Sequence, residues 1–428
     1  MAERLVCHAS ETVRSAIDQI SFFQLAVVVL TGGAASYAFS TLNPLQEMIR
    51  VAMDLTDRQI SILQGPALYL PPILIGIPIG LLIDRFSRTR LLTIFTALEI
   101  VGTVSTALAS NFVAMLLARA LIGSMQAANA TNASALIAEW VAPTRRGRTL
   151  MILGALQLAG VSAVFALGGE LALYFEHIPN GWRWSMLGLT VPLVLVFILT
   201  LWLREPPRAN DEVHVPGWRA TAEALWRYRA KLLTLSFGQL VLAIGYTVAL
   251  VWTTPILARH FKLSPDRIGA LMGMALLVSG LLGTLLGGTL ADLCQRTGGP
   301  RRLISLMMIL ALVQVPSGFY GIMPSVPLVI LLLLILFTLS GMKGIICTTV
   351  ASLVLPKELF GAAFGALVAI SAIFSSTAPV VVSVLADRIG GVTGIREALT
   401  SMCVITSLVG AAVFASGRRH FESAKERS

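Results

Sequence analysis

The chain has 428 residues, of which 13% are charged and 56% are hydrophobic, and its formal net charge is +10. A soluble domain typically carries roughly 25% charged residues, so too few polar side chains are present to coat a water-soluble globule. The composition therefore excludes a cytosolic enzyme and a nucleic-acid-binding protein, and it indicates a membrane protein. The four cysteines show no CxxC or metal-ligand spacing, so we expect neither a disulfide framework nor a metal site.

Long windows without charge recur along the chain, and each can supply the ~20 mostly apolar residues of a membrane-spanning helix. The window 303–342 is longer, and Gly318, Gly321, Pro324 and Pro327 divide it into two spans. None of the windows has the apolar/polar alternation of barrel strands. We therefore predict an all-α polytopic membrane protein with twelve transmembrane helices. In chain order these are 22–42, 60–83, 91–109, 112–138, 149–172, 184–203, 232–257, 268–290, 303–321, 326–354, 362–385 and 398–416.

The distribution of Lys and Arg predicts the topology. With both termini in the cytoplasm, 22 of the 32 basic residues fall in cytoplasmic segments and eight on the opposite side, as the positive-inside rule requires. We expect a multi-pass protein of the plasma membrane, or of the inner membrane in a bacterium. Its segments are a cytoplasmic N-terminal segment (1–21), a six-helix bundle (22–203), a cytoplasmic linker with an interfacial helix (204–231), a second six-helix bundle (232–416) and a cytoplasmic tail (417–428).

Two similar segments reveal an internal repeat. GLLIDRFSRTRLL begins at Gly80 and GTLADLCQR begins at Gly288, and each follows the second span of one six-helix half. Parallel repeats of this kind are typical of transporters built from two related bundles. The carboxylates of Asp84 and Asp292 can accept hydrogen bonds from the N-terminus of a facing helix, although a single copy could also be a chance Asp in a basic juxtamembrane cluster.

Glycines precede both copies at intervals of four residues, in the pairs Gly76/Gly80 and Gly283/Gly287. Because small residues at this spacing lie on one helix face, we expect a neighbouring helix to approach closely at both pairs.

The motif carries a family resemblance. Gly80, Leu82, Asp84, Arg85, Arg88 and Arg90 match the loop motif of the major facilitator superfamily, with Ser87 where Gly is usual. The chain resembles that family over essentially its whole length, which implies two six-helix pseudo-repeat bundles in the major facilitator fold. The resemblance implies a cytoplasmic latch between the halves, with Asp84 facing the start of the eleventh helix near Gly361 and Gly365. The latch residues are then Gly80, Asp84, Arg85, Arg88, Gly288 and Asp292.

A narrower resemblance runs through ARALIGSMQ, PTRRGR, GWRWSMLGL and REPPR. These segments are similar to the Spinster-like branch and its bacterial relatives, whose characterised members move amphipathic lipids. The chain departs from that branch in two places. It reads SYAFSTLNP over Ser36–Pro44 where an Asp-Arg pair is common, and it has Gln126 where a Glu is common. Both titratable groups that proton coupling uses in that branch are therefore missing here.

Four ionisable residues fall inside predicted spans, where such groups are costly and therefore candidates for function: Glu99, Arg119, Glu170 and Lys343. Arg119 and Gln126 lie within about 20° of one helical face, and Asn129 lies near the same stripe. A face this polar cannot point at lipid, so we expect it to line a central cavity. Arg119 would then hold an anionic head group or pair with an acid; alternatively, it fixes its helix to neighbouring carbonyls.

Lys343 lies too deep in its span to reach the headgroups, and Gly341 and Gly344 leave room beside it. It is a candidate substrate counter-ion or titrating group. Glu99 and Glu170 are candidate coupling groups, with structural pairing of Glu99 and solvation of Glu170 as the alternatives. Further candidates for contact with substrate are Tyr37, Gln157, Tyr246 and Trp252, for each of which ordinary packing is the competing explanation.

The chain contains no nucleotide, hydrolase or metalloprotease motif, and we expect no cofactor. We predict a secondary active transporter, working as a monomer by alternating access, that moves a small amphipathic or organic-anion solute, lipids included. The coupling ion is open, with the proton as one candidate. Two alternatives remain: a broad-range efflux pump for hydrophobic drugs, and a non-transporting membrane receptor or lipid-binding protein.

Overall fold

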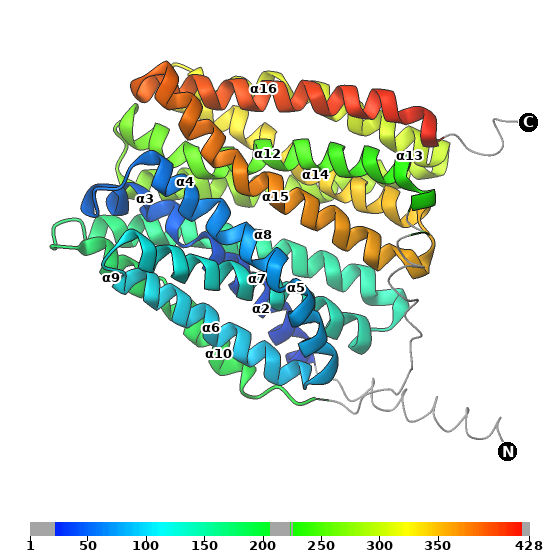
Figure 1. Ribbon diagram of the computed structural model, residues 1–428, viewed down its shortest axis with the longest axis horizontal. Helices are drawn as coiled ribbons and strands as arrows, with labels where there is room; N and C mark the ends of the chain where they lie inside the picture. The colour runs from blue at the N-terminus through cyan, green and yellow to red at the C-terminus, as the bar shows by residue number, and fades with distance from the viewer. Residues whose placement is uncertain (1–21, 206–222, 224–225, 422–428) are drawn as a thin grey trace, which may run out of the picture.

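The computed structural model describes residues 22–205, 223 and 226–421, and within them it contains helices and no strand. The first group of helices (Figure 1) comprises α2 (Phe22–Ser40), α3 (Leu42–Ala52), α4 (Asp57–Gln64), α5 (Pro66–Arg85), α6 (Arg88–Leu108), α7 (Phe112–Trp140), α8 (Pro143–Tyr174), α9 (Gly181–Gly188) and α10 (Val191–Thr200). The second group comprises α12 (Arg229–Arg259), α13 (Pro265–Gln314), η1 (Pro316–Ile322), α14 (Val326–Val354), α15 (Lys357–Ile389), α16 (Gly391–Gly417) and η2 (Arg418–Phe421).

These helices form twelve passes in the described residues. The pairs α2/α3, α4/α5 and α9/α10 each make one pass. The 50-residue helix α13 makes two, because Gly299 adopts φ 61° and ψ −154°, outside the helical region, and Pro300 follows it. Ten helical stretches of the described chain are long and apolar enough to cross a membrane, one of them spanning both passes of α13. The twelve-helix prediction is confirmed.

Local sequence sets several helix ends. The Thr56 hydroxyl accepts from the Gln59 amide while the Gln59 side chain accepts from the Thr56 amide, which is a capping box at the start of α4. The Asn111 side chain accepts from the Ala114 amide at 2.9 Å and starts α7. These caps satisfy amide groups that the first turn of a helix leaves unpaired.

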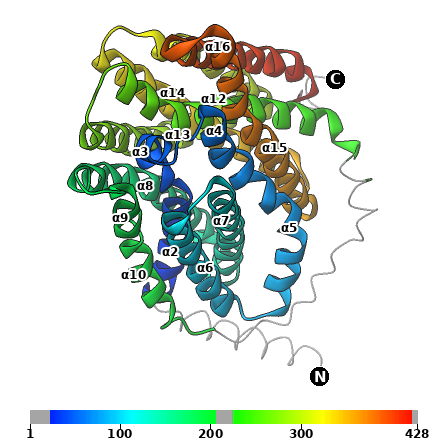
Figure 2. The same ribbon diagram turned by 60° about the vertical axis from the view of Figure 1, so that its left-hand side comes forward.

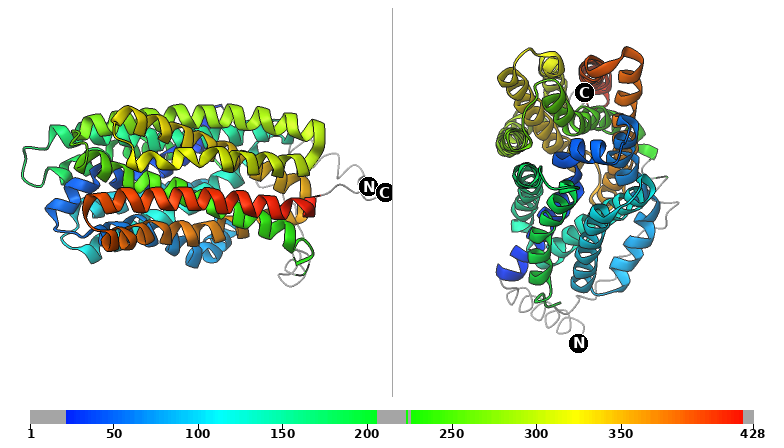
Figure 3. Two further views of the ribbon diagram at one scale, coloured as in Figure 1. Left: turned by 90° about the horizontal axis from the view of Figure 1, so that it is seen from above. Right: turned by 90° about the vertical axis from the view of Figure 1, so that its left-hand side faces the viewer.

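The two groups of helices form two halves that lie side by side. Figure 1 shows α2–α10 below and α12–α16 above, and the end-on view in Figure 3 separates the same groups. The start of α2 and the end of α16 lie at one end, which we call the terminal end; α3, α4 and α9 lie at the other, which we call the distal end (Figures 1 and 2). The predicted boundaries of the two bundles at residues 203 and 232 stay predictions.

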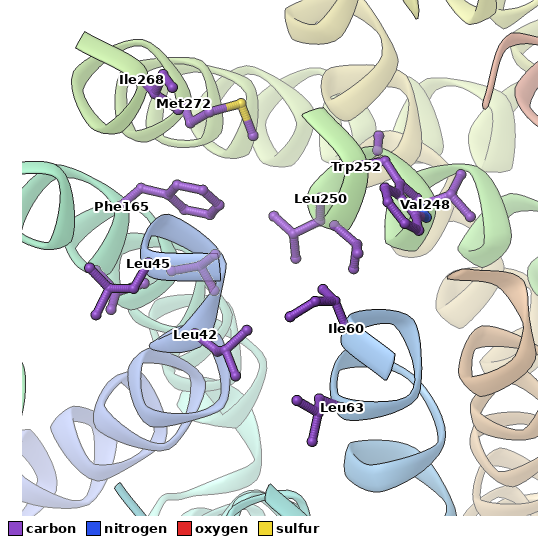
Figure 4. Close-up of a cluster of buried hydrophobic side chains, with 14 of the residues drawn as sticks. Leu42, Leu45, Ile60, Leu63, Phe165, Val248, Leu250, Trp252, Ile268 and Met272 are labelled. Carbon is purple, nitrogen blue, oxygen red and sulfur yellow. The ribbon is translucent and has the colours of Figure 1, made fainter. Parts of the chain in front are cut away.

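The largest apolar core joins the two halves toward the distal end (Figure 4). Ile60 of α4 and Leu45 of α3 belong to it, together with Phe165 of α8, Trp252 of α12 and Met272 of α13. Each of these side chains is at most 2% exposed. Burying these apolar side chains between the two halves stabilises the contact of the halves toward the distal end.

The two glycine pairs behave differently. A Cβ on Gly283 would lie 2.9 Å from the Thr338 carbonyl oxygen, and one on Gly287 would lie 2.9 Å from the Met342 Cα, so α14 packs closely there as predicted. At Gly76 and Gly80 a Cβ would meet nothing within 4 Å. The expectation of close approach at Gly76 and Gly80 is therefore wrong for the described residues, none of which covers that face of α5 within 4 Å.

Most of the predicted linker, 206–222 with 224 and 225, lies outside the described residues, as do 1–21 and 422–428. The interfacial helix and the terminal segments stay predictions. Of the linker's aromatic residues, Trp226 is described: it is 66% exposed, and the Arg229 guanidinium lies 5.3 Å from its ring centre.

Candidate functional site

A cavity of about 380 Å³ lies between the two halves, on the terminal side of the core in Figure 4. On α12, for example, Tyr246 and Thr247 line the cavity and the next residue, Val248, belongs to the core. The cavity takes residues from both halves: Tyr69, Leu158, Ala243, Tyr246, Thr247, Leu276, Ser279, Gly280, Phe337, Ser340, Gly341 and Ser375.

The lining combines aromatic rings with hydroxyl groups and contains no charged residue. The Tyr246 and Phe337 rings meet edge to face with their centres 5.2 Å apart. The Ser340 hydroxyl is buried and has no hydrogen-bond partner in the described chain. Because a buried hydroxyl without a partner is costly, Ser340 is suited to bind a polar atom of a ligand.

Arg119 of α7 lies behind the cavity wall. It is fully buried, and its Nη2 donates to the Phe39 carbonyl at 2.8 Å, while its Nε and Nη1 have no partner among the described residues. The Phe39 ring packs edge to face on Tyr69, which lines the cavity, at a centre distance of 5.3 Å. Arg119 is thus connected to the cavity wall through Phe39, and its contact with a carbonyl matches the helix-fixing alternative.

Lys343 of α14 is also fully buried, and its Nζ donates to the Oε1 of Gln314. It lies outside the lining, but two residues before it, Gly341 faces the cavity. No ion pair involves Lys343 in the described part of the chain. Each half therefore holds a buried cation near the cavity.

Glu99 and Asn129 pair with each other inside the first half. The Asn129 Nδ2 donates to the Glu99 Oε1 at 2.8 Å, both residues are fully buried, and the Glu99 Oε2 has no partner among the described residues. Asn129 thus faces α6, although its spacing predicted a face shared with Arg119 and Gln126. Its role as a substrate ligand stays a prediction.

The other predicted site residues are dispersed, and only Tyr246 lines the cavity. Trp252 is buried in the core, where its Nε1 donates to the Pro379 carbonyl at 3.3 Å. Tyr37 is buried on α2, Gln126 and Gln157 are half-buried, and Glu170 is exposed on α8. Their roles in binding or coupling stay predictions.

Sequence reasoning missed most of the hydroxyl groups of the lining. Thr247, Ser279, Ser340 and Ser375 are short polar residues within apolar spans. Such residues also bond back to their own helix, as Ser279 does to the Leu276 carbonyl at 3.1 Å. The usable signal was limited to Thr247 and Ser340, which lie on the same helices as Tyr246 and Phe337.

Of the predicted latch, the Asp84 side chain and Gly361 lie outside what the structure describes. Arg85 and Asp292 are exposed, and a Cβ on Gly80, Gly288 or Gly365 would meet nothing within 4 Å. Arg88 joins elements of the first half, because its Nη1 lies 2.5 Å from the Glu139 carboxylate. A latch between the halves at the terminal end stays a prediction.

An ion cluster that the sequence did not predict joins the halves at the distal end. The Arg259 guanidinium of α12 contacts the carboxylates of Glu47 and Asp57 at 2.6–2.8 Å, with two hydrogen bonds to each. Nearby, the Gln46 Nε2 donates to the Val251 carbonyl at 2.8 Å. These bonds close the distal end across the boundary between the halves.

Twelve membrane passes in two halves around a shared cavity are the architecture of a multi-pass membrane transporter. The Major Facilitator Superfamily family model matches residues 28–379. The chain belongs to the Major Facilitator Superfamily.

Solved structures support the fold. A bacterial homologue of the human lysosomal transporter Spinster, in an inward-facing and unoccupied conformation, is similar with a TM-score of 0.80, 19% identity and coverage of 94% of this chain and 98% of that one. The same homologue in an inward-facing, occupied conformation gives a TM-score of 0.78 over 93% and 96% of the two chains.

Three characterised relatives are similar in sequence. Protein spinster of Drosophila melanogaster is 24% identical over 50% of this chain and 36% of its own length. The 3-(3-hydroxy-phenyl)propionate transporter of Escherichia coli K12 is 30% identical over 52% of this chain and 53% of its own. The triacylglyceride transporter of Mycolicibacterium hassiacum is 28% identical over 46% and 37%. The matches thus span about a third to a half of the length of these relatives.

Proposed function

We propose that this protein is a secondary active transporter that moves a small amphipathic organic anion across the membrane by alternating access. The observation that carries the proposal is the cavity between the halves, with its aromatic and hydroxyl lining and a buried cation behind the wall in each half. The plasma membrane, or the inner membrane of a bacterium, is the proposed location, with the terminal end in the cytoplasm.

The size of the cavity supports a small substrate. Ligand pockets usually enclose about 300–1,000 Å³, and this one, at about 380 Å³, lies near the lower bound. The rings of Tyr69, Tyr246 and Phe337 offer an apolar surface for a carbon skeleton or an aromatic ring. The hydroxyls of Ser340 and Ser375 can bind its polar end.

The charge around the cavity supports an anion. Arg119 and Lys343 are buried, and neither forms an ion pair in the described chain. The buried acid Glu99 is already hydrogen-bonded to Asn129. Because charges interact strongly in a medium of low dielectric constant, two buried cations near the cavity attract an anion into it and disfavour a cationic drug.

The relatives agree with this substrate class in part. One of them is named a transporter of 3-(3-hydroxy-phenyl)propionate, an aromatic acid. Another is named a triacylglyceride transporter, a much larger apolar substrate for which a cavity of about 380 Å³ is small. An aromatic or amphipathic acid is therefore the first class to test.

The test is a panel of tracers in proteoliposomes that contain the purified full chain. Organic acids, a lysolipid and a cationic dye are compared with and without a pH gradient. We expect uptake of the acids, and we expect Arg119→Met to reduce it while the matched change of an exposed arginine, Arg267→Met, leaves it unchanged.

Each of the other outcomes would support a different function. Uptake restricted to the dye would establish the drug efflux pump, and transport of the lysolipid alone would establish a lipid carrier. Acid binding without flux under any gradient would establish the non-transporting receptor.

A further inference from the structure

Lys343 is a buried cation with no acid to balance it. Its side chain is fully buried in α14, and the one partner of its Nζ in the described chain is the neutral amide of Gln314. An ammonium group has three N–H donors, so this single bond leaves it under-coordinated. A charged lysine in such a place is unfavourable unless an anion lies nearby or the proton leaves.

The elements packed around α14 supply no such anion among their described side chains. Their titratable groups include the half-buried Tyr246 on α12 and the buried Tyr320 on η1, and α14 itself carries the buried Cys347 one turn beyond Lys343. Phenols and thiols are neutral near pH 7. On α13 the facing group is Gln314, and on α15 the group that reaches the cavity is the hydroxyl of Ser375.

The position of Lys343 on its helix links it to the cavity. Ser340 lines the cavity, and residues three apart on a helix have Cβ atoms about 5–6 Å from each other. Gly341 lies between them in the cavity wall, and a Cβ on Gly344 would meet nothing within 4 Å. An anion bound at Ser340 would therefore come close enough to Lys343 to compensate its charge.

We propose that Lys343 is the proton-binding site of transport, taking up one proton when an anionic substrate enters the cavity and releasing it when the substrate leaves. In the empty cavity the amine is neutral and donates one N–H to the Gln314 amide oxygen. When the anion arrives, the amine binds a proton and becomes ammonium, and anion and proton cross together with no net charge. This proposal rests on the proposed function.

The assignment follows from linkage between the two ligands. If the bound anion favours the protonated amine, then the proton must favour anion binding by the same factor. Neither of the other buried groups fits as well. Arg119 does not lose its proton in proteins, and Glu99 lies outside the cavity lining, where its carboxylate accepts from Asn129 within the first half.

The experiment measures binding and uptake of 3-(3-hydroxyphenyl)propionate by the full-length protein as a function of pH. Above the pH at which Lys343 titrates, the wild-type affinity should fall about tenfold per pH unit, because one proton binds with each anion. Titration calorimetry in two buffers of different ionisation enthalpy should show an uptake of close to one proton per anion. An inward-directed proton gradient should drive accumulation in proteoliposomes.

Two variants separate this role from a structural one. Lys343→Arg keeps a cation that does not titrate, so exchange of the acid should persist while proton uptake on binding and gradient-driven accumulation are lost. Lys343→Met should bind the acid at least tenfold more weakly, with no pH dependence. Lys262→Arg, on an exposed loop residue, is the matched control and should behave as wild type.

The outcomes distinguish this proposal from the proposed function. If no organic acid in the panel is transported, the proposed function fails and the proton site fails with it. If acids are transported but wild-type binding takes up no proton, or Lys343→Arg keeps gradient-driven accumulation, the proton site alone is overturned.

Discussion

The two ends of the molecule differ in how the halves meet. At the distal end, Arg259 bonds Glu47 and Asp57 across the boundary, and a Cβ on Gly169 would lie 2.5 Å from the Pro265 carbonyl oxygen. At the terminal end, a Cβ on Gly80 or on Gly365 would meet nothing within 4 Å. The same pair of bundles is held together at the distal end, whereas at the terminal end these two glycines face open space among the described residues.

We therefore expect the distal contacts and the predicted latch at the terminal end to stabilise different conformations. The distal contacts belong to the conformation seen here, whereas the predicted latch around Asp84 would join the halves in a conformation that closes the terminal end. A transporter that alternates between the two must break the first set to form the second. We therefore expect substitutions in the distal contacts and substitutions in the latch motif to shift the equilibrium between the two conformations in different ways.

The largest effect is expected at the contact between α8 and α13. Gly169→Leu would place a side chain against the backbone of Pro265 and Gly269, which cannot move aside. Overpacking of this kind costs roughly 1–3 kcal/mol or more, so the distal end should open and transport should fall at least tenfold. Spin labels at the exposed residues Glu176 and Arg267 would report a longer distance.

Gly154→Leu is the matched control, because Gly154 is on the same helix and its Cβ would meet nothing within 4 Å. If both variants lengthen the distance between the labels equally, the close contact is not what holds the distal end.

The ion cluster should have the second-largest effect. Arg259→Gln removes four hydrogen bonds and leaves the carboxylates of Glu47 and Asp57 without the cation between them. Hydrogen bonds to charged groups contribute roughly 1.5–3 kcal/mol each when buried, and less here because the side chains are 17–25% exposed. We expect a roughly tenfold shift away from the distal-closed conformation, measured with the same spin labels.

Adding Glu47→Gln and Asp57→Asn to Arg259→Gln removes the uncompensated negative charge and should restore part of the closure. Arg388→Gln, at an exposed arginine of α15, is the control. A triple variant that is no better closed than Arg259→Gln alone would show that charge balance is not the cause.

The sequence could predict the distal end only in part. Charge counting placed Arg259 on the side opposite the termini, but its pairing with Glu47 and Asp57 depends on how two halves about 200 residues apart dock. The passes themselves were predictable, because hydrophobic length is a local property. The break in α13 at Gly299 was likewise visible as Gly-Gly-Pro between two apolar windows.

The site was harder to predict for a physical reason. Helical periodicity places Arg119, Gln126 and Asn129 near one face of their helix, but periodicity alone does not determine which neighbouring helix each side chain faces. Asn129 turns to Glu99, because a buried carboxylate and a buried amide satisfy each other. Arg119 reaches the Phe39 carbonyl for the same reason. Arg119, Asn129 and Glu99 thus find partners within their own half, so the lining is left to hydroxyls and rings that carry no strong sequence signal.

A smaller effect is expected from the repeated aspartates at the terminal end. Asp84→Asn should lower turnover roughly two- to tenfold, because a carboxylate at the N-terminus of a facing helix contributes up to about 1–2 kcal/mol to the terminal-closed state. The distance between the distal spin labels should not change, since this motif does not act at that end. Asp292→Asn should have a similar but weaker effect, and Asp387→Asn at an exposed position of α15 serves as the control. A changed distal distance in Asp84→Asn would contradict the expectation that the distal contacts and the latch stabilise different conformations.

The smallest effect concerns pH at the distal surface. The His260 Nε2 lies 2.9 Å from the Arg396 Nη1, and Arg396 also donates to the carbonyls of Gly321 and Met323. Burial, and then the positive charge of Arg396, lower the pKa of His260 below its ordinary value of 6.5. The folded protein therefore resists protonation of this imidazole, so its contribution to stability is full above pH 6.5 and declines as the pH falls below it. We expect the melting temperature to drop slightly between pH 7.5 and 5.5, and His260→Gln to remove that component. His177→Gln, at another exposed histidine, should leave the drop unchanged; an equal flattening in both variants would show that the contact with Arg396 is not responsible.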